Sequence, residues 1–387
     1  MVDKTRIRWA ARREPGGHMR RHALVGTWIA CLAGTAAFGC GDDGSGDDDA
    51  LADDGAAEAE TGADADADAD PEATPDMDAN PDPAADGTED GVDDETSVPV
   101  DPAAPGPFPW SVVDDQVVRG SRTTPVSVLI PDVPGGAALP LVLFLPGFQM
   151  RSAWYLPLLE RIASHGFVVV RADPPASLMS SSHPEQMLDA RAVLDWALDP
   201  AGPVGGRADA ARVAASGHSA GGKIATMLAF ADSRVTALLG FDPVNGSGPL
   251  GYTADQPDIV PDQVAPLAIP IGLLGETTDS TAGLGGQACA PAAQNFQTFY
   301  DAATSAPWVA SWELLGADHL DFVYDTSTCG LPCSFCRNGA ADGNAVRATV
   351  QTLAVAFLRR HLLGDAAQDA WLLGEFLPAE VVLQHRP

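Results

Sequence analysis

The sequence has no lysine or arginine between residues 41 and 101, although that segment holds 24 aspartates and glutamates. Residues 102–387 have 15 basic against 27 acidic side chains, and residues 1–40 have seven against two. Binding to nucleic acid is dominated by contacts of Lys and Arg with phosphates. Because the chain has a net charge of −31 and few basic side chains beyond its N-terminus, we expect no nucleic-acid partner.

A long hydrophobic run is also missing. The apolar stretch at residues 23–38 is shorter than the roughly 20 residues that a transmembrane helix needs. Two arginines precede it, and Ala37-Phe38-Gly39-Cys40 ends it in the manner of a bacterial lipobox. We expect residues 1–39 to be a lipoprotein signal peptide. Acyl chains on Cys40 would then anchor the exported protein in the cell envelope, on the periplasmic side or at the cell surface. A plain cleaved signal peptide and an uncleaved anchor are the alternatives.

Aromatic residues are absent from the segment that follows. Residues 40–107 consist largely of Asp, Ala, Gly and Pro. Such a composition offers too little apolar surface to offset the entropy of an ordered chain, and its like charges extend it. We therefore expect a disordered linker over residues 40–107 and one folded catalytic domain over residues 108–387.

From residue 108 onward, apolar runs alternate with helical patterns, and no internal repeat is found. Continuous apolar runs indicate strands buried on both faces, and βα alternation is typical of a parallel sheet with helices on both sides. We expect an α/β fold with a mostly parallel central sheet and a frayed end around His385. The strands are predicted over residues 126–130, 139–145, 167–170, 213–215, 235–241, 269–274 and 308–315. The helices are predicted over residues 154–165, 184–197, 292–303 and 345–362, and directly after Ser219.

The motif Gly217-His218-Ser219-Ala220-Gly221 stands between an apolar strand and a helical pattern. This is the context of a nucleophile elbow, where a serine is exposed on a strained turn from strand to helix. Side chains at Gly217 and Gly221 would clash because the turn brings the chain close to itself. The start of the helix directs N–H groups toward an oxyanion. The alternative is a glycine-rich turn in which Ser219 caps the helix.

A nucleophilic serine needs a base, and the base needs an acid that orients it. In α/β-hydrolases the acid and the histidine follow the serine in the chain. His319 lies just after the last predicted strand, 100 residues beyond Ser219, and is the expected base. The acid stays open between Asp242 and Asp279, which follow two successive predicted strands, with Glu276 close to Asp279.

Two backbone N–H groups are expected to form the oxyanion hole. One belongs to Ala220, directly after the serine, and the other to Phe148, in the loop after the strand at residues 139–145. His218 flanks the serine, but such elbows point this side chain elsewhere, so we do not expect it to be the base. This chemistry needs no cofactor and no metal.

The segments that carry these motifs, taken in order, resemble the chlorophyllase family. They are also similar to plasma-type platelet-activating-factor acetylhydrolase and, more distantly, to cutinase-like polyester hydrolases. The resemblance covers roughly residues 125–330 and rests on residues 143–148, 159–170, 217–223, 239–244 and 317–321. It implies the α/β-hydrolase fold and hydrolysis of carboxylic esters. It also implies Asp242 as the acid, with Asp279, the position that polyester hydrolases use, as the alternative.

The sequence departs from the family pattern at two positions. Pro146 stands where a histidine usually precedes the oxyanion glycine, and Ala220 replaces a larger residue, so the pocket mouth differs. The signal and the acidic linker do not fit a plant chlorophyll enzyme, so the resemblance implies ester hydrolysis without chlorophyll as substrate. We expect a serine-dependent carboxylic ester hydrolase that forms an acyl-enzyme on a small-molecule or polymeric ester. The alternatives are a non-catalytic surface binding module and a hydrolase of amide or peptide bonds.

Beyond Cys40, the cysteines are few: Cys289, Cys329, Cys333 and Cys336. An exported chain lies in an oxidising compartment, which favours two disulfides among them, and three pairings are possible. A zinc site formed by the same four residues is the alternative.

Overall fold

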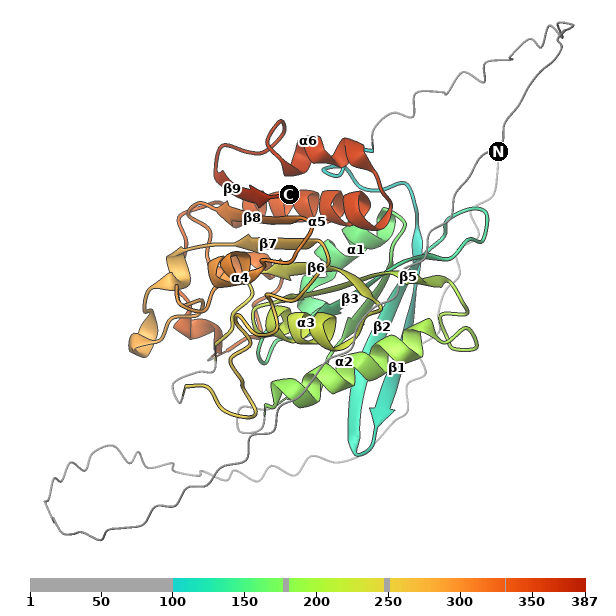
Figure 1. Ribbon diagram of the computed structural model, residues 1–387, viewed down its shortest axis with the longest axis horizontal. Helices are drawn as coiled ribbons and strands as arrows, with labels where there is room; N and C mark the ends of the chain where they lie inside the picture. Colours follow the sequence, from blue (N-terminus) through green and yellow to red (C-terminus); the bar gives the residue numbers. More distant parts are fainter. Residues whose placement is uncertain (1–99, 177–180, 247–250, 331) are drawn as a thin grey trace, which may run out of the picture. The chain divides into compact units, whose positions relative to one another are not determined.

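The computed structural model describes residues 100–176, 181–246, 251–330 and 332–387 (Figure 1). The predicted signal peptide, Cys40 and the predicted linker up to residue 99 lie outside the described residues. The last predicted linker residues contact helix α1 (Leu156–Ser164): the Gly106 N–H donates to Ser164 Oγ at 2.9 Å, and Arg161 donates to the Ala103 carbonyl at 2.6 Å. Among the described residues, no helix has both the length and the apolar character needed to cross a membrane.

Within the described residues, nine strands form one mixed sheet in the order β1-β2-β4-β3-β5-β6-β7-β8-β9. Strands β3 to β8 pair in parallel, whereas β1 with β2, β2 with β4, and β8 with β9 are antiparallel. The mostly parallel central sheet of the prediction is therefore confirmed. The strands are β1 Trp110–Arg119, β2 Arg122–Pro131, β3 Leu139–Leu145, β4 Val168–Ala172, β5 Ala208–His218, β6 Val235–Phe241, β7 Ile271–Gly275, β8 Val309–Leu314 and β9 Val381–Arg386.

Helices cover both faces of the sheet (Figure 1). Alternate residues of β3 supply the two cores, because successive side chains of a strand point to opposite faces. Leu141 and Leu143 pack in the core beneath α2, α3 and α4, whereas Val142 and Phe144 pack beneath α1, α5 and α6. The helices are α1 Leu156–Ser164, α2 His183–Leu198, α3 Ala220–Ala231, α4 Phe296–Ala302, α5 Gly343–Leu362 and α6 Asp369–Leu372.

Four parts of the fold differ from the prediction, and one of them is the short helix α6, which was not predicted. Strand β1 was not predicted, and the tail predicted to fray is strand β9, in which His385 pairs with Ala310 of β8. Helix α4 begins only at Phe296, because the Asn295 side chain accepts the Gln297 N–H and caps it there. The central elements stand where they were predicted, with bounds that shift by a few residues.

Candidate active site

Ser219 lies at the sharp turn between β5 and α3, with φ 55° and ψ −124°. Its side chain makes no helix-capping hydrogen bond, so the simple capping interpretation does not describe it. The glycines around it are sterically required: a Cβ on Gly217 would lie 2.5 Å from the backbone of Gly221, and one on Gly221 would overlap the Leu145 carbonyl oxygen. The turn therefore holds the serine in a strained conformation with close backbone packing on both sides.

The structure brings Ser219, His319 and Asp242 together. His319 Nε2 lies 2.9 Å from Ser219 Oγ, and His319 Nδ1 lies 2.5 Å from Asp242 Oδ2. Asp242 directly follows β6 and His319 follows β8, so both reach the carboxyl end of the parallel sheet where the elbow lies. Both side chains are buried, and the contacts form one continuous line from hydroxyl through imidazole to carboxylate.

Asp279, the alternative acid, takes a different place. One of its carboxylate oxygens accepts the backbone N–H of His319 at 3.0 Å, and the other accepts the Arg337 N–H at 2.7 Å. It therefore holds the main chain of His319, whereas Asp242 faces the ring.

A buried carboxyl group, Glu276, lies beside this pair. Its Oε2 accepts the Asp279 N–H at 2.9 Å, and its own N–H donates to Asp242 Oδ1 at 3.4 Å. Burial and the neighbouring Asp242 charge raise the pKa of Glu276 to about 10, so it is protonated at neutral pH. Burial also raises the pKa of Asp242, while the hydrogen bond from His319 acts in the opposite direction.

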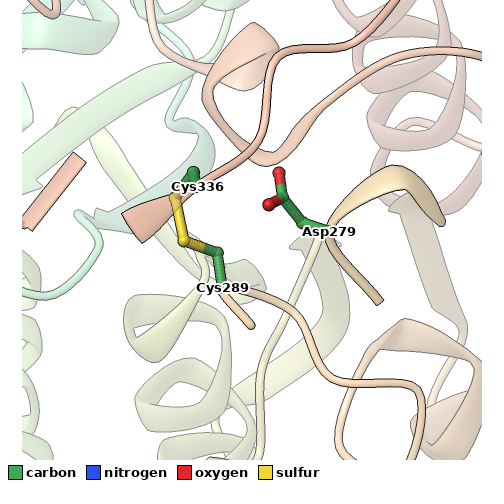
Figure 2. Close-up of side chains that lie close together, drawn as sticks. All are labelled: Asp279, Cys289 and Cys336. Carbon is green, nitrogen blue, oxygen red and sulfur yellow. A yellow bond between two sulfur atoms is a disulfide. The ribbon is translucent and has the colours of Figure 1, made fainter. Parts of the chain in front are cut away.

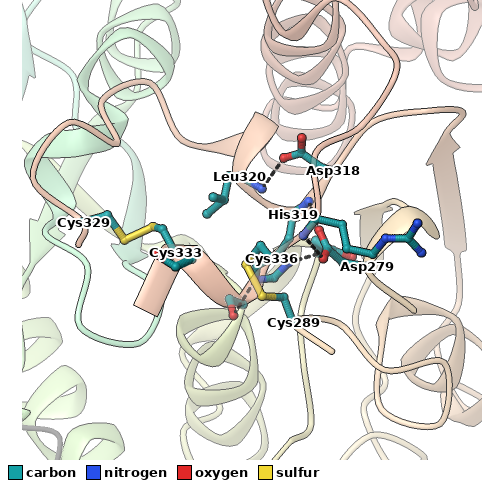
Figure 3. The surroundings of a disulfide bond; sticks show 12 residues. Asp279, Cys289, Asp318, His319, Leu320, Cys329, Cys333 and Cys336 are labelled. Carbon is teal, nitrogen blue, oxygen red and sulfur yellow. Dashed lines mark hydrogen bonds and ion pairs between the residues drawn. A yellow bond between two sulfur atoms is a disulfide. The ribbon is translucent and has the colours of Figure 1, made fainter. Parts of the chain in front are cut away.

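The short helix that begins at His319 fixes the position of the histidine (Figure 3). The Asp318 side chain accepts the N–H groups of Leu320 and Asp321, and the Asp321 side chain accepts the Asp318 N–H in return. This capping box uses both aspartates that flank the histidine, and neither faces its ring.

In the described part of the chain, the cysteines pair as Cys289–Cys336 and Cys329–Cys333. Figure 2 shows the first disulfide beside the Asp279 carboxylate. A zinc site requires free thiolates, whereas these sulfurs are bonded to one another in pairs. The two predicted disulfides are confirmed, and the zinc alternative is not supported.

A cavity of 410 Å³ adjoins the elbow and the predicted oxyanion loop. Phe148 and Ala220 both line it. The loop approaches the serine closely, since a Cβ added to Gly147 would lie 3.4 Å from Ser219 Cβ. An ester in this cavity would therefore lie beside both predicted oxyanion donors. The other lining residues include Pro146, Gln149, Met150, Arg151, Pro174, Pro175, Gln186 and Ile224.

Two features of the site were missed in the sequence. Tyr155, in the short 3₁₀ turn before α1, is buried with its hydroxyl 2.8 Å from His218 Nδ1. Glu276 was noticed as a possible acid, but its burial and its contact with Asp242 were not foreseen. The sequence signal for Tyr155 is weak, because an aromatic residue before an amphipathic helix is usually interpreted as part of the hydrophobic core.

Comparisons with known proteins show which family the chain is similar to. The chlorophyllase family model matches residues 104–385. The chain is 31% identical to chlorophyllase-1 of Arabidopsis thaliana over 68% of this chain and 85% of that protein. It is 29% identical to the chloroplastic chlorophyllase-1 of Citrus sinensis, over 64% and 75% of the two chains. A shorter segment of 77 residues is 44% identical to cutinase est1 of Thermobifida alba, covering 20% and 24%.

The family match runs from before β1 into β9 and includes the elbow, the predicted oxyanion loop and the segment of His319. The predicted resemblance to chlorophyllases and cutinase-like hydrolases and the predicted α/β-hydrolase fold are therefore confirmed. This chain belongs to the chlorophyllase family of α/β-hydrolases, and it is a serine ester hydrolase.

Proposed function

We propose that Ser219, His319 and Asp242 are the catalytic triad through which this serine ester hydrolase cleaves carboxylic esters. One observation carries the proposal: the His319 ring lies 2.9 Å from the Ser219 hydroxyl and 2.5 Å from the Asp242 carboxylate. A nucleophile, a base and an orienting acid in this relation are what acyl transfer requires.

In the first half-reaction, Ser219 Oγ attacks the ester carbonyl carbon while His319 Nε2 takes the hydroxyl proton. The carbonyl electron pair moves to oxygen, which becomes a tetrahedral oxyanion. When the oxyanion collapses, the bond to the alcohol oxygen breaks, and His319 returns the proton to the leaving alcohol. Asp242 holds the ring with Nδ1–H inward and stabilises the imidazolium that forms.

In the second half-reaction, water attacks the acyl-enzyme. His319 takes a proton from the water, a second oxyanion forms and collapses, and Ser219 leaves with that proton. The products are one carboxylic acid and one alcohol for each water consumed. The N–H groups of Phe148 and Ala220 would donate to both oxyanions, an effect on the order of 3 kcal/mol for each donor.

The first test compares the full-length protein with its Ser219→Ala variant on p-nitrophenyl acetate and butyrate. We expect the variant to lose about 10⁴-fold or more in rate, because the covalent step is removed. A fluorophosphonate probe should label the wild type and leave the variant unlabelled. Equal rates, or equal labelling, would contradict Ser219 as the nucleophile.

The same proteins separate the alternatives. Matched p-nitroanilide substrates report amide cleavage, and faster turnover of the anilides than of the esters would favour a peptide or amide hydrolase. A folded wild type that neither turns over esters nor reacts with the probe would favour a binding module. Chlorophyll and cutin extend the ester panel to the substrates named for the relatives.

We further propose that the protein is exported and lipid-anchored through Cys40. The sequence supports this through the apolar stretch at residues 23–38 and the small residues that end in the cysteine. Metabolic labelling with a fatty acid should mark the wild type and not Cys40→Ala. On cell fractionation, the wild type should be found in the membrane fraction. Unlabelled wild type would contradict the anchor and leave the ester chemistry untouched.

A further inference from the structure

The residue before the proposed nucleophile is fully buried and contacts two other parts of the site. His218 Nε2 lies 3.0 Å from the carbonyl oxygen of His319, and His218 Nδ1 lies 2.8 Å from the Tyr155 hydroxyl. A carbonyl oxygen can only accept, so Nε2 must carry the proton. Nδ1 then has a free lone pair, and Tyr155 donates to it.

Tyr155 extends this chain of hydrogen bonds to the oxyanion loop. Its hydroxyl oxygen accepts the Gly147 N–H at 3.3 Å, directly before the Phe148 peptide group. The Met150 thioether also lies 2.9 Å from the hydroxyl, but a sulfur is a weaker acceptor than an imidazole nitrogen. A Cβ on Gly147 would lie only 3.1 Å from His218 Nδ1, so loop and ring are closely packed.

We propose that Tyr155 and His218 are positioning residues for ester hydrolysis, which join the loop carrying the Phe148 N–H to the main chain of His319. This inference rests on the triad and oxyanion hole proposed above. The hydrogen bonds run from Gly147 N–H to the Tyr155 hydroxyl, from that hydroxyl to His218 Nδ1, and from His218 Nε2–H to the His319 carbonyl.

We call this series of hydrogen bonds from the Gly147 N–H to the His319 carbonyl the relay. The surroundings keep its side chains in one protonation state. Burial and the neighbouring His319 lower the pKa of His218 well below its usual value. Burial raises the pKa of the Tyr155 hydroxyl, so it stays a donor. The His218 ring also packs against the rings of His319 and Phe322, with centroids 4.5 Å and 5.8 Å away. A neutral, fixed His218 therefore holds the loop that carries the Phe148 N–H at a constant distance from the main chain of His319.

Tyr155→Phe tests the relay, because it removes one oxygen and keeps the ring. The Gly147 N–H and His218 Nδ1 would lose their shared partner, and the oxyanion loop could shift relative to Ser219. We expect kcat to fall by about 10- to 100-fold, which is part of the effect of deleting an oxyanion donor, with KM within about twofold. Inhibition by a trifluoromethyl ketone, which forms an oxyanion on the serine, should weaken by the same factor.

Two further variants separate positioning from general loss of structure. Tyr324→Phe removes a tyrosine hydroxyl that donates to the Arg347 carbonyl at 3.3 Å, outside the relay, and should keep kcat within about twofold. His218→Gln can place an amide N–H near the former Nε2 and should recover part of the activity that His218→Leu loses. Thermal melting of each variant reports folding separately.

Nitrogen NMR of the histidine rings gives a readout that needs no turnover. His218, assigned by its loss in His218→Gln, should show the Nε2–H tautomer and stay neutral between about pH 5 and 8. A protonated Nδ1, or titration near the ordinary histidine pKa, would overturn the relay. So would a Tyr155→Phe variant whose kcat and ketone inhibition equal those of Tyr324→Phe. Lack of Ser219-dependent hydrolysis in the wild type would instead contradict the proposed function, and the NMR result would still decide the relay.

Discussion

Asp279, which the sequence left open as an alternative acid, accepts the backbone N–H of His319 at 3.0 Å. The ring of the same histidine turns to Asp242 instead. Two carboxylates from the ends of the neighbouring strands β6 and β7 thus reach one residue at different atoms. One orients the imidazole and the other fixes the main chain that carries it.

This division predicts different outcomes for two isosteric variants. Asp242→Asn puts an amide beside Nδ1, which neither stabilises the imidazolium nor selects the right tautomer, so kcat should fall by about 10⁴-fold. Asp279→Asn keeps an oxygen that accepts the His319 N–H, and kcat should fall by less than about tenfold. Steady-state kinetics on p-nitrophenyl butyrate would measure both. If Asp279→Asn lost as much as Asp242→Asn, Asp279 would be the acid and this assignment of roles would be wrong.

The sequence could not decide between these acids. Both follow buried parallel strands, and parallel order places both strand ends at the same edge of the sheet. The choice depends on where each side chain points after its turn. Asp242 has a positive φ of 40°, which no composition or periodicity predicts. The elbow was predictable because its glycines have a steric reason that local sequence displays.

The same contrast holds for the fold. Central strands such as β3 are apolar throughout, and their position was predicted. Edge strand β1 is mostly exposed and carries Asp114 and Asp115, so it lacks a buried-strand pattern. Strand β9 is half-buried and gains its order from pairing with β8, a contact that the tail sequence does not reveal. Where a strand is ordered mainly by pairing with a neighbouring strand, its own sequence is not enough to predict it.

Glu276 should make stability fall as pH rises. Its pKa is about 10 in the folded protein against 4.5 ordinarily, so between these values the folded state binds more protons than the unfolded state. The unfolding free energy then decreases with pH by up to about 1.4 kcal/mol per pH unit. Glu276→Gln mimics the neutral form and should gain stability relative to wild type as pH rises from 5 to 9. Denaturant unfolding at several pH values measures the difference, with the exposed Glu380→Gln as control. A difference that does not change with pH would contradict a protonated Glu276.

Lys223 should make stability rise with pH, which is the opposite of the effect of Glu276. It is fully buried in α3, and its ammonium donates to the Asn245 carbonyl at 3.1 Å. Burial lowers its pKa from 10.5 to about 8, so between these values the unfolded state binds more protons and stability rises with pH. The stability of Lys223→Met relative to wild type should therefore be highest below pH 8, and it should fall by up to about 1.4 kcal/mol per pH unit between pH 8 and 10.5. Urea unfolding at pH 7, 9 and 10.5 would check this, and a constant difference would argue against the lowered pKa.

The disulfides offer a matched comparison. Cys289–Cys336 closes a span of 47 residues, whereas Cys329–Cys333 closes a span of four. The first also includes Cys336, the neighbour of Arg337, whose backbone N–H donates to Asp279. The disulfide with the longer span constrains the unfolded chain more. Its loss should also loosen the position of Asp279, which accepts the His319 N–H.

We therefore expect Cys289→Ser/Cys336→Ser to lose about 4 kcal/mol of unfolding free energy and Cys329→Ser/Cys333→Ser about 2 kcal/mol, on the chain-entropy relation. The first pair should also lower kcat at temperatures where both variants remain folded, because the Arg337 N–H is no longer held against the Asp279 carboxylate. Denaturant unfolding and ester kinetics on the two double variants measure both effects. Equal stabilities would show that span length does not govern these disulfides. An unchanged kcat in the first pair would show that the His319 N–H and the short 3₁₀ helix Thr278–Ser280 are enough to hold Asp279.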